Sequence, residues 1–398
     1  MQRSLPLEGI RVIDYTHYLA GPYAARCLAD LGAEVIKVEP IKGDPARGLP
    51  YDINGESGFF LQQNSGKKGI AVNVKHPAGL KLMQELIRTA DVFLENYRPG
   101  ALSRVGLGYE DLIELNDRIV YCSLSAYGQY GSKSSQAGFG LVAEAMSGAM
   151  SLIGNPGEPP PVFRIPIADI LTGTHGVAAI CASLFGRTQE RKPVRLDLSL
   201  YDCMVALHDH ALQAYLLSSG ECNPYPAGRT VPGLTIYGTF AASDGCLVIA
   251  AQTDELWAKL AQLIGGEELA SDSRFAQHSA RNANSEEAIA IVDKWISSHT
   301  SVADCLAALK AADIPCSPVQ TIAQVASDNH LMDRGMFERQ NHPKLGDVTL
   351  PSTPFAPSFY KSEMRPAPTL GQNSEEIALS LGFSYNQVES MRKEGAIC

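Results

Sequence analysis

Asp169 is the ionisable residue whose surroundings are hardest to explain, because it lies in the apolar stretch 164–173 (RIPIADILTG). A carboxylate among apolar neighbours is costly unless it caps a helix, finds a partner or takes part in chemistry. On composition alone, a helix cap is the favoured role for Asp169. A catalytic role is compatible with it, because a helix amino terminus keeps a carboxylate ionised and nucleophilic.

Two arginines form a second candidate group. Arg98 lies in the segment 96–100 (NYRPG), directly after a predicted strand, and Arg104 follows six residues later. Guanidinium groups match phosphates well because they donate hydrogen bonds in a planar fork. The pair could bind a nucleotide phosphate or form ordinary surface salt bridges, and the residues alone leave both possibilities open.

Lysines add positive charge to the same half of the chain. Lys67, Lys68 and Lys75 could each approach an anion, but most lysines are simply solvated. The turn at residues 20–22 (AGP) is a third candidate anion site, at a predicted helix amino terminus. It has one glycine instead of a GxGxxG motif, so we interpret Glu39 as a strand-end charge and disfavour a nicotinamide dinucleotide.

Other familiar catalytic patterns are absent from the sequence. His208 and His210 are two residues apart and do not share a helix face, and neither HExxH nor GxSxG occurs. Cys122 lies in a predicted strand, where a small buried side chain is the simpler interpretation. We therefore expect no metal site.

Composition restricts the class of protein. The chain has 398 residues, 45% of them hydrophobic, and a mean hydropathy of -0.06, as expected for a packed globular protein. A net charge of -10 disfavours nucleic acid and anionic membranes as partners. Nine cysteines without a CxxC pair, and a first segment without an apolar leader, predict a reduced cytoplasmic protein. We found no uninterrupted apolar stretch of a membrane span's length.

Strands and helices alternate around these candidates. Predicted strands cover residues 10–14, 34–38, 70–74, 92–95 and 119–123, and predicted helices cover 23–31 and 76–90. Such βαβ units build parallel sheets, so an α/β fold with a doubly wound sheet is predicted. A long helix at residues 167–185, rich in small side chains, would carry Asp169 near its start.

The length favours two domains. Glycine and proline become dense at residues 220–235, which indicates a linker, and a hairpin follows at 238–251 with its turn at Asp244-Gly245. Helices are predicted at 255–264 and 286–297. We therefore predict a large domain from residues 1–220 and 326–398, and a smaller α+β domain with its linkers in residues 221–325.

Four blocks together resemble the class III CoA-transferase family, of the CaiB/BaiF type. They are residues 7–40, 64–79, 91–112 and 166–173, which include ENYRPG and PIADILTG. The tail, with PCSPV and LGQN, is similar to the same family. The resemblance implies a Rossmann-like large domain built from both ends of the chain, a small domain between them, and an interlocked, ring-like homodimer.

The resemblance also implies a covalent mechanism. Asp169 would attack an acyl-CoA thioester to give an aspartyl anhydride and then an aspartyl-CoA thioester. CoA enters as a substrate, without a metal, and the partners are small molecules: an acyl-CoA and a carboxylic acid. The glycine-containing loop 138–140 could supply oxyanion donors. By position, the family's CoA contacts fall on Leu19, Ala20, Val72, Asn73, Val74, Lys75, Asn96, Tyr97, Arg98, Arg104, Phe139 and Gly140.

Departures from the family pattern bear on the substrate. Formyl-CoA transferases carry a glutamine where this chain has Leu19, and a run of glycines in the small domain that is absent here. The stretches 105–112 and 119–123 resemble family members that act on glutarate. We therefore expect a succinyl-CoA-like donor and a small dicarboxylic acceptor. Arg229 could pair with a second carboxylate or simply face solvent.

Two other functions stay open on the sequence. α-Methylacyl-CoA racemases of the same superfamily use a histidine and an aspartate to move a proton beside the thioester. They carry a Gly-His-Asp motif where this chain has residues 137–140 (AGFG), without a histidine. A non-catalytic CoA-binding relative is the second alternative, and the complete motif around Asp169 disfavours it.

Overall fold

The computed structural model describes residues 5–49, 52–187, 192–355 and 365–398, and the chain forms two compact units. Unit 1 is discontinuous in sequence and contains both ends of the chain. It comprises Met1–Ala149, Phe163–His210 and Asn329–Cys398, whereas unit 2 comprises Met150–Val162 and Ala211–Asp328.

A six-stranded sheet forms the centre of unit 1, with the order β5-β2-β1-β6-β7-β8. Every neighbouring pair is parallel, which confirms the predicted parallel sheet. The order reverses between β1 and β6, and in such sheets the carboxyl ends at the reversal leave a crevice for ligands. The strands are β1 (Arg11–Tyr15), β2 (Glu34–Glu39), β5 (Lys68–Ala71), β6 (Val92–Glu95), β7 (Val120–Ser125) and β8 (Val194–Ser199).

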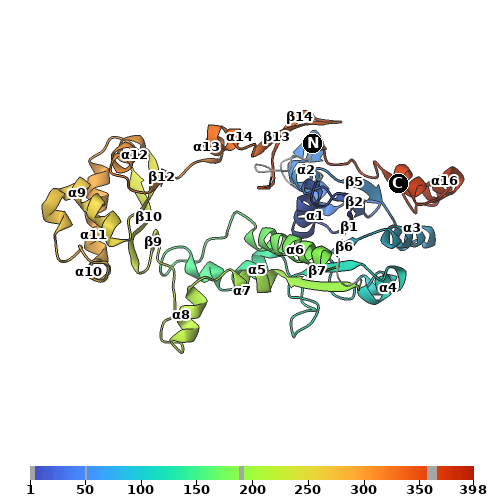
Figure 1. The fold of residues 1–398 in the computed structure, drawn as a ribbon, viewed down its shortest axis with the longest axis horizontal. Helices are drawn as coiled ribbons and strands as arrows, with labels where there is room; N and C mark the ends of the chain where they lie inside the picture. The colour runs from blue at the N-terminus through green and yellow to red at the C-terminus, as the bar shows by residue number, and fades with distance from the viewer. Residues whose placement is uncertain (1–4, 50–51, 188–191, 356–364) are drawn as a thin grey trace. The chain divides into compact units, whose positions relative to one another are not determined.

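Helices cover both faces of this sheet, because successive strand residues face opposite cores (Figure 1). Ile13 packs with α3 (Pro77–Arg88), α4 (Tyr109–Leu115), α15 (Ser374–Ser380) and α16 (Tyr385–Lys393). Val12 packs on the other face with α1 (Ala20–Asp30), α6 (Ile167–Gly186) and α7 (Leu200–Ala206). Two apolar layers therefore hold the sheet rigidly beneath its carboxyl edge.

Helix α6 agrees with the predicted helix to within one residue. By length and composition it is also the one helix among the described residues that could cross a membrane. In unit 1 it packs against α1, α7 and the sheet, with Val177 and Ile180 buried. The segment α5 (Gly140–Met146), which the sequence did not reveal, lies against its amino-terminal part.

Two element boundaries near the sheet edge differ from the prediction. Helix α1 begins at Ala20 and not at Tyr23, because proline is tolerated in a first helical turn and Pro22 falls there. Strand β5 ends at Ala71, so residues 72–74 lie outside it. Asn73 instead donates its backbone N–H to the carbonyl of Ala396 near the chain's end.

Unit 2 contains a four-stranded antiparallel sheet with the order β12-β11-β10-β9. The predicted hairpin is β10–β11, with Ala242 paired to Gly245, and the predicted linker contains β9. Trp257, Phe240 and Leu247 are fully or almost fully buried in its core. The elements are β9 (Thr230–Val231), β10 (Leu234–Ala242), β11 (Gly245–Ala250), β12 (Cys316–Pro318), α8 (Ala211–Leu217), α9 (Asp254–Ala270), α10 (His278–Ala283), α11 (Ser285–Ser297), α12 (Val302–Ala311) and α13 (Ile322–Ala326).

The remaining elements belong to unit 1. They are β3 (Asp52–Ile53), β4 (Glu56–Ser57), α2 (Gly58–Asn64), α14 (Asn329–Asp333), β13 (Phe337–His342) and β14 (Gly346–Pro351).

Candidate active site

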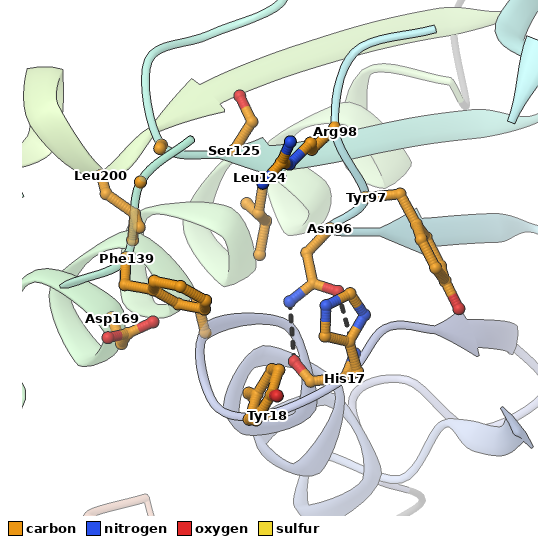
Figure 2. A pocket seen from close by; sticks show the side chains of 13 residues that line it. His17, Tyr18, Asn96, Tyr97, Arg98, Leu124, Ser125, Phe139, Asp169 and Leu200 are labelled. Carbon is orange, nitrogen blue, oxygen red and sulfur yellow. Dashed lines mark hydrogen bonds between the residues drawn. The ribbon is translucent and has the colours of Figure 1, made fainter. Parts of the chain in front are cut away.

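A cavity of about 300 Å³ opens at the carboxyl edge of the sheet in unit 1, where the strand order reverses. Figure 2 shows Asp169 with Phe139 on one side of it, and Asn96 with His17 on the other. The cavity is lined by His17, Tyr18, Ala20, Asn96, Tyr97, Arg98, Leu124, Ser125, Ala126, Gly138, Phe139, Asp169 and Leu200.

Asp169 lies in the first turn of α6, three residues after the N-cap Pro166. The interpretation of Asp169 as the cap itself is therefore wrong, because the cap position precedes the first helical residue. The backbone N–H of Ala20, the first residue of α1, lies close enough to the carboxylate to lower its pKa. Two helix amino termini thus meet at this one side chain.

Gly140 makes room for the Asp169 carboxylate. A Cβ atom at this position would lie 2.1 Å from Oδ2 of Asp169, closer than any real contact. The preceding residue, Phe139, is 66% exposed, and its ring meets that of Tyr18 edge-on, with centroids 6.2 Å apart. The start of α5 therefore shapes both the carboxylate's position and one wall of the cavity.

The electrostatics favour a carboxylate that is basic yet ionised at neutral pH. Burial raises the pKa of Asp169 to about 6, the charge of Glu144 adds to the rise, and the Ala20 N–H opposes it. A carboxylate with this pKa is mostly ionised at pH 7 and is more basic than an ordinary aspartate. This combination suits a nucleophile.

The loop between β1 and α1 is held by partly buried hydrogen bonds and by one buried ion pair. The Asn96 side chain accepts from the His17 N–H at 2.9 Å and donates to the His17 carbonyl at 2.7 Å. Asp44 accepts from the Tyr18 N–H and pairs with Lys37. Burial lowers the pKa of His17, so its ring is neutral at pH 7.

A buried ion pair supports the same loop from beneath. Lys67 Nζ lies 2.8 Å from Oδ2 of Asp14, and both side chains are inaccessible to solvent. Lys67 also donates to the carbonyl of Pro22 in the first turn of α1. This corrects the idea that Lys67 could be an anion ligand or a solvated lysine. Lys68 is at the surface, paired with Glu34 and Glu376.

The structure brings some of the predicted CoA contacts together and leaves others apart. Ala20, Asn96, Tyr97, Arg98 and Phe139 line the cavity with Asp169, and Gly140 lies directly behind the carboxylate. The other predicted residues, which do not line it, are Leu19, Val72, Asn73, Val74, Lys75 and Arg104.

The residues outside the cavity have different positions. Leu19 is buried at the N-cap of α1. Residues 72–75 follow β5, which lies two strands away from β1 along the same carboxyl edge. Arg104 is exposed in a short turn after Arg98, and Arg98 also borders a small second pocket beside Glu95 and Arg195.

Sequence reasoning missed His17, Tyr18 and Glu144. The first two lie within four residues of the end of the first predicted strand, so their place at the carboxyl edge was a usable signal. Glu144 carried no such signal, because α5 was not predicted. Arg229 pairs with Asp293 in unit 2. Within the described residues, no group of three His, Cys, Asp or Glu side chains could hold a metal ion.

Comparisons with known proteins cover almost the whole chain. The model of CoA-transferase family III matches residues 7–374. Mouse succinyl-CoA:glutarate CoA-transferase is 36% identical over 397 residues, covering 98% of this chain and 90% of that protein. Formyl-CoA:oxalate CoA-transferase of Streptomyces coelicolor is 32% identical, covering 98% and 99%. A crystal structure of a CaiB/BaiF family protein from Brucella suis is 33% identical with a TM-score of 0.84, covering 95% of this chain and 100% of that one.

Proposed function

The chain belongs to CoA-transferase family III, and we propose that it moves CoA from a succinyl-CoA-like donor to a small dicarboxylic acid. The chain is an enzyme of this class, with CoA thioesters as substrates. The observation that carries the proposal is the Asp169 carboxylate, at a cavity wall with its pKa raised to about 6. The names of two relatives contain glutarate and oxalate, which are both dicarboxylates, and this supports a dicarboxylic acid as the acceptor.

The proposed reaction begins with attack of an Asp169 oxygen on the acyl carbonyl of the donor. The C–S bond breaks, CoA leaves as a thiolate, and a mixed anhydride remains on Asp169. The thiolate then attacks the aspartyl carbonyl, which releases the donor acid and leaves an aspartyl-CoA thioester. These two steps retain the energy of the thioester in a covalent bond to the enzyme.

The second half of the reaction mirrors the first. The acceptor carboxylate attacks the aspartyl thioester, releases CoA thiolate and forms a second mixed anhydride. The thiolate attacks the acceptor's acyl carbonyl, which gives the new acyl-CoA and frees the Asp169 carboxylate. In this scheme the Ala20 N–H orients the nucleophile, and Asn96 holds the loop that presents Ala20.

The cavity accommodates the reacting end of the substrates. Its volume of about 300 Å³ lies at the lower limit of small-molecule pockets, so it suits an acyl thioester and not the nucleotide of CoA. Of the two predicted phosphate ligands, Arg98 lines the cavity and Arg104 does not; Arg104 lies further along the same segment. We propose that this segment binds the CoA phosphates outside the cavity. We also propose that the protein is a cytoplasmic homodimer.

A substrate panel tests this function. Purified protein is incubated with succinyl-CoA, acetyl-CoA or formyl-CoA as donor and with glutarate, malate, oxalate or acetate as acceptor, and each new acyl-CoA is quantified by mass spectrometry. We expect succinyl-CoA with a dicarboxylate of four or five carbons to give the highest kcat/KM. Equal rates with acetate, or preference for formyl-CoA with oxalate, would contradict the proposed substrates.

One observation favours testing a second activity. His17, with its pKa lowered, lies across the cavity from Asp169 in Figure 2, and proton exchange beside a thioester needs a base and an acid on opposite sides. Incubating a 2-methylacyl-CoA with the protein in D₂O distinguishes the two activities. Deuterium at the α-carbon without CoA exchange would indicate a racemase.

A further inference from the structure

Glu144 is a buried carboxylate that the proposed reaction does not use. It is 2% exposed, on α5, one helical turn after Gly140. Its Oε1 accepts a hydrogen bond of 3.3 Å from the N–H of Ala168 in the first turn of α6. Within the described residues Glu144 takes part in no ion pair, although a buried carboxylate normally needs one.

Gly140 and Glu144 act on the same few atoms. They are four residues apart in one helical segment, so both face the amino terminus of α6. Gly140 leaves the space that Oδ2 of Asp169 occupies, and Glu144 binds the backbone one residue before Asp169. The first N–H groups of a helix lack partners within the helix, so a side chain from another element can fix where the helix starts.

We propose that Glu144 is a positioning residue for Asp169: it anchors the start of α6 through Ala168 and, by its negative charge, sets the reactivity of the Asp169 carboxylate. The inference rests on the proposed function, in which Asp169 is the nucleophile. A negative charge close to a carboxyl group disfavours ionisation of that group, which raises its pKa and makes the carboxylate more basic. The charge of Glu144 accordingly adds to the raised pKa of Asp169.

Other ionisable groups on the elements packed against α6 do not supply this effect. Burial raises the pKa of Tyr23, Cys27, Cys122 and Cys203, which stay neutral at pH 7. On α6 itself His175 is exposed, and across the cavity His17 is neutral. The charged groups on these elements have other partners or face solvent. Arg26 pairs with Asp30, Asp197 accepts from the Gln129 N–H, and Arg195 lies over the Tyr109 ring. Asp202 and Arg98 are exposed.

Glu144→Gln isolates the charge, because the amide oxygen can still accept the hydrogen bond from Ala168. Removing the charge should make the Asp169 carboxylate less basic. Its acylation should then persist to lower pH, with a slower rate at the plateau because a weaker base is a weaker nucleophile. Burial remains, so the pKa should stay above that of an ordinary aspartate.

The experiment measures the rate at which an acyl-CoA donor makes Asp169 trappable by hydroxylamine, between pH 4.5 and 8. For wild type we expect a loss of rate as the pH falls through about 6. For Glu144→Gln the midpoint should fall by about one unit. Glu144→Asp keeps the charge and should retain the wild-type midpoint while losing rate, and Glu114→Gln, at an exposed position on α4, should change neither.

The outcomes separate the two ideas. If wild type is trapped on Asp169 but Glu144→Gln has the wild-type midpoint, the role of Glu144 is wrong and the proposed function stands. If wild type is never trapped on Asp169, the proposed function fails and this inference fails with it. Should Glu144→Gln not fold, a changed midpoint in folded Glu144→Asp would also contradict the inference.

Discussion

Gly140 shows how closely the position of Asp169 depends on a single neighbouring residue. A methyl group there would occupy the place of the carboxylate, so Asp169 would have to rotate away or α5 would have to move. We predict that Gly140→Ala lowers kcat/KM for CoA transfer by about a hundredfold, because small displacements of a catalytic group have effects of that size.

The matched control for Gly140→Ala is Gly186→Ala at the end of α6, where an added Cβ meets no atom within 4 Å. Steady-state kinetics of both variants, with circular dichroism as a check of folding, test the prediction. Wild-type activity in Gly140→Ala would show that the observed position of the Asp169 carboxylate is not needed for the reaction.

At the residue scale, the sequence predicted the candidate nucleophile Asp169 but not the neighbours that position it. Asp169 was found because a carboxylate in an apolar segment is unusual and because the surrounding motif resembles a known family. The closeness of Gly140 to Asp169 depends on the contact between two helices, and Glu144 lies in a segment for which no helix was predicted. Neither can be inferred from local spacing.

At the scale of elements, the approach of α1 to α6 brings the Ala20 N–H to Asp169. Gly173 permits this close approach of the two helices, because a Cβ atom there would lie only 2.7 Å from the Ala20 carbonyl oxygen. A Cβ atom at Gly176, on the same helix, would make an ordinary contact at 3.6 Å. We predict that Gly173→Ala destabilises the protein by about 1–3 kcal/mol and reduces activity.

Gly176→Ala, on the same helix, is the control and should change the stability by less than about 1 kcal/mol. Urea unfolding followed by circular dichroism gives both values. If the two variants were equally stable and equally active, close packing of α1 on α6 would not be what orients Asp169.

The loop before α1 depends on the buried pair of Lys67 and Asp14. Lys67→Met leaves the Asp14 carboxylate buried without its partner, so we expect a loss of about 3–5 kcal/mol in the free energy of unfolding. Adding Asp14→Asn should restore part of this loss, because no buried charge then lacks its counterion.

Lys68→Met, in the adjacent surface pair, should cost less than about 1 kcal/mol and is the control for losing a lysine. Unfolding midpoints in urea for wild type and these three variants test the prediction. A double variant no more stable than Lys67→Met alone would contradict the electrostatic explanation.

Elements with a strong pattern were predictable from the sequence, and those with a weak one were not. Strand β6 was predicted to the residue, and β1, β2, β7, α3 and α6 to within two residues, because their apolar runs are bounded by clear turn signals. Strand β8 was missed because it lies at the sheet edge, where its side chains are only partly buried. The seven residues of α5 are too few to show helical periodicity.

On the scale of the whole molecule, the resemblance of four sequence blocks predicted the family correctly, and the family match extends over residues 7–374. The dimer stays a prediction. Large apolar side chains are exposed in unit 1 away from the cavity, including Ile165 and Phe185, and a second subunit would remove them from water. We predict that light scattering after size exclusion gives twice the chain mass of 42.8 kDa. A mass of one chain at micromolar concentration would contradict it.

The central claim is that Asp169 carries the acyl group and then CoA during transfer. The most direct test is to incubate the protein with succinyl-CoA, quench with hydroxylamine and identify the modified peptide by mass spectrometry. We predict a hydroxamate on Asp169 in wild type, none in Asp169→Asn, and at least a thousandfold lower CoA transfer in that variant, in line with the loss of other nucleophiles. Transfer at the wild-type rate by Asp169→Asn, with no adduct on the wild-type residue, would contradict the account.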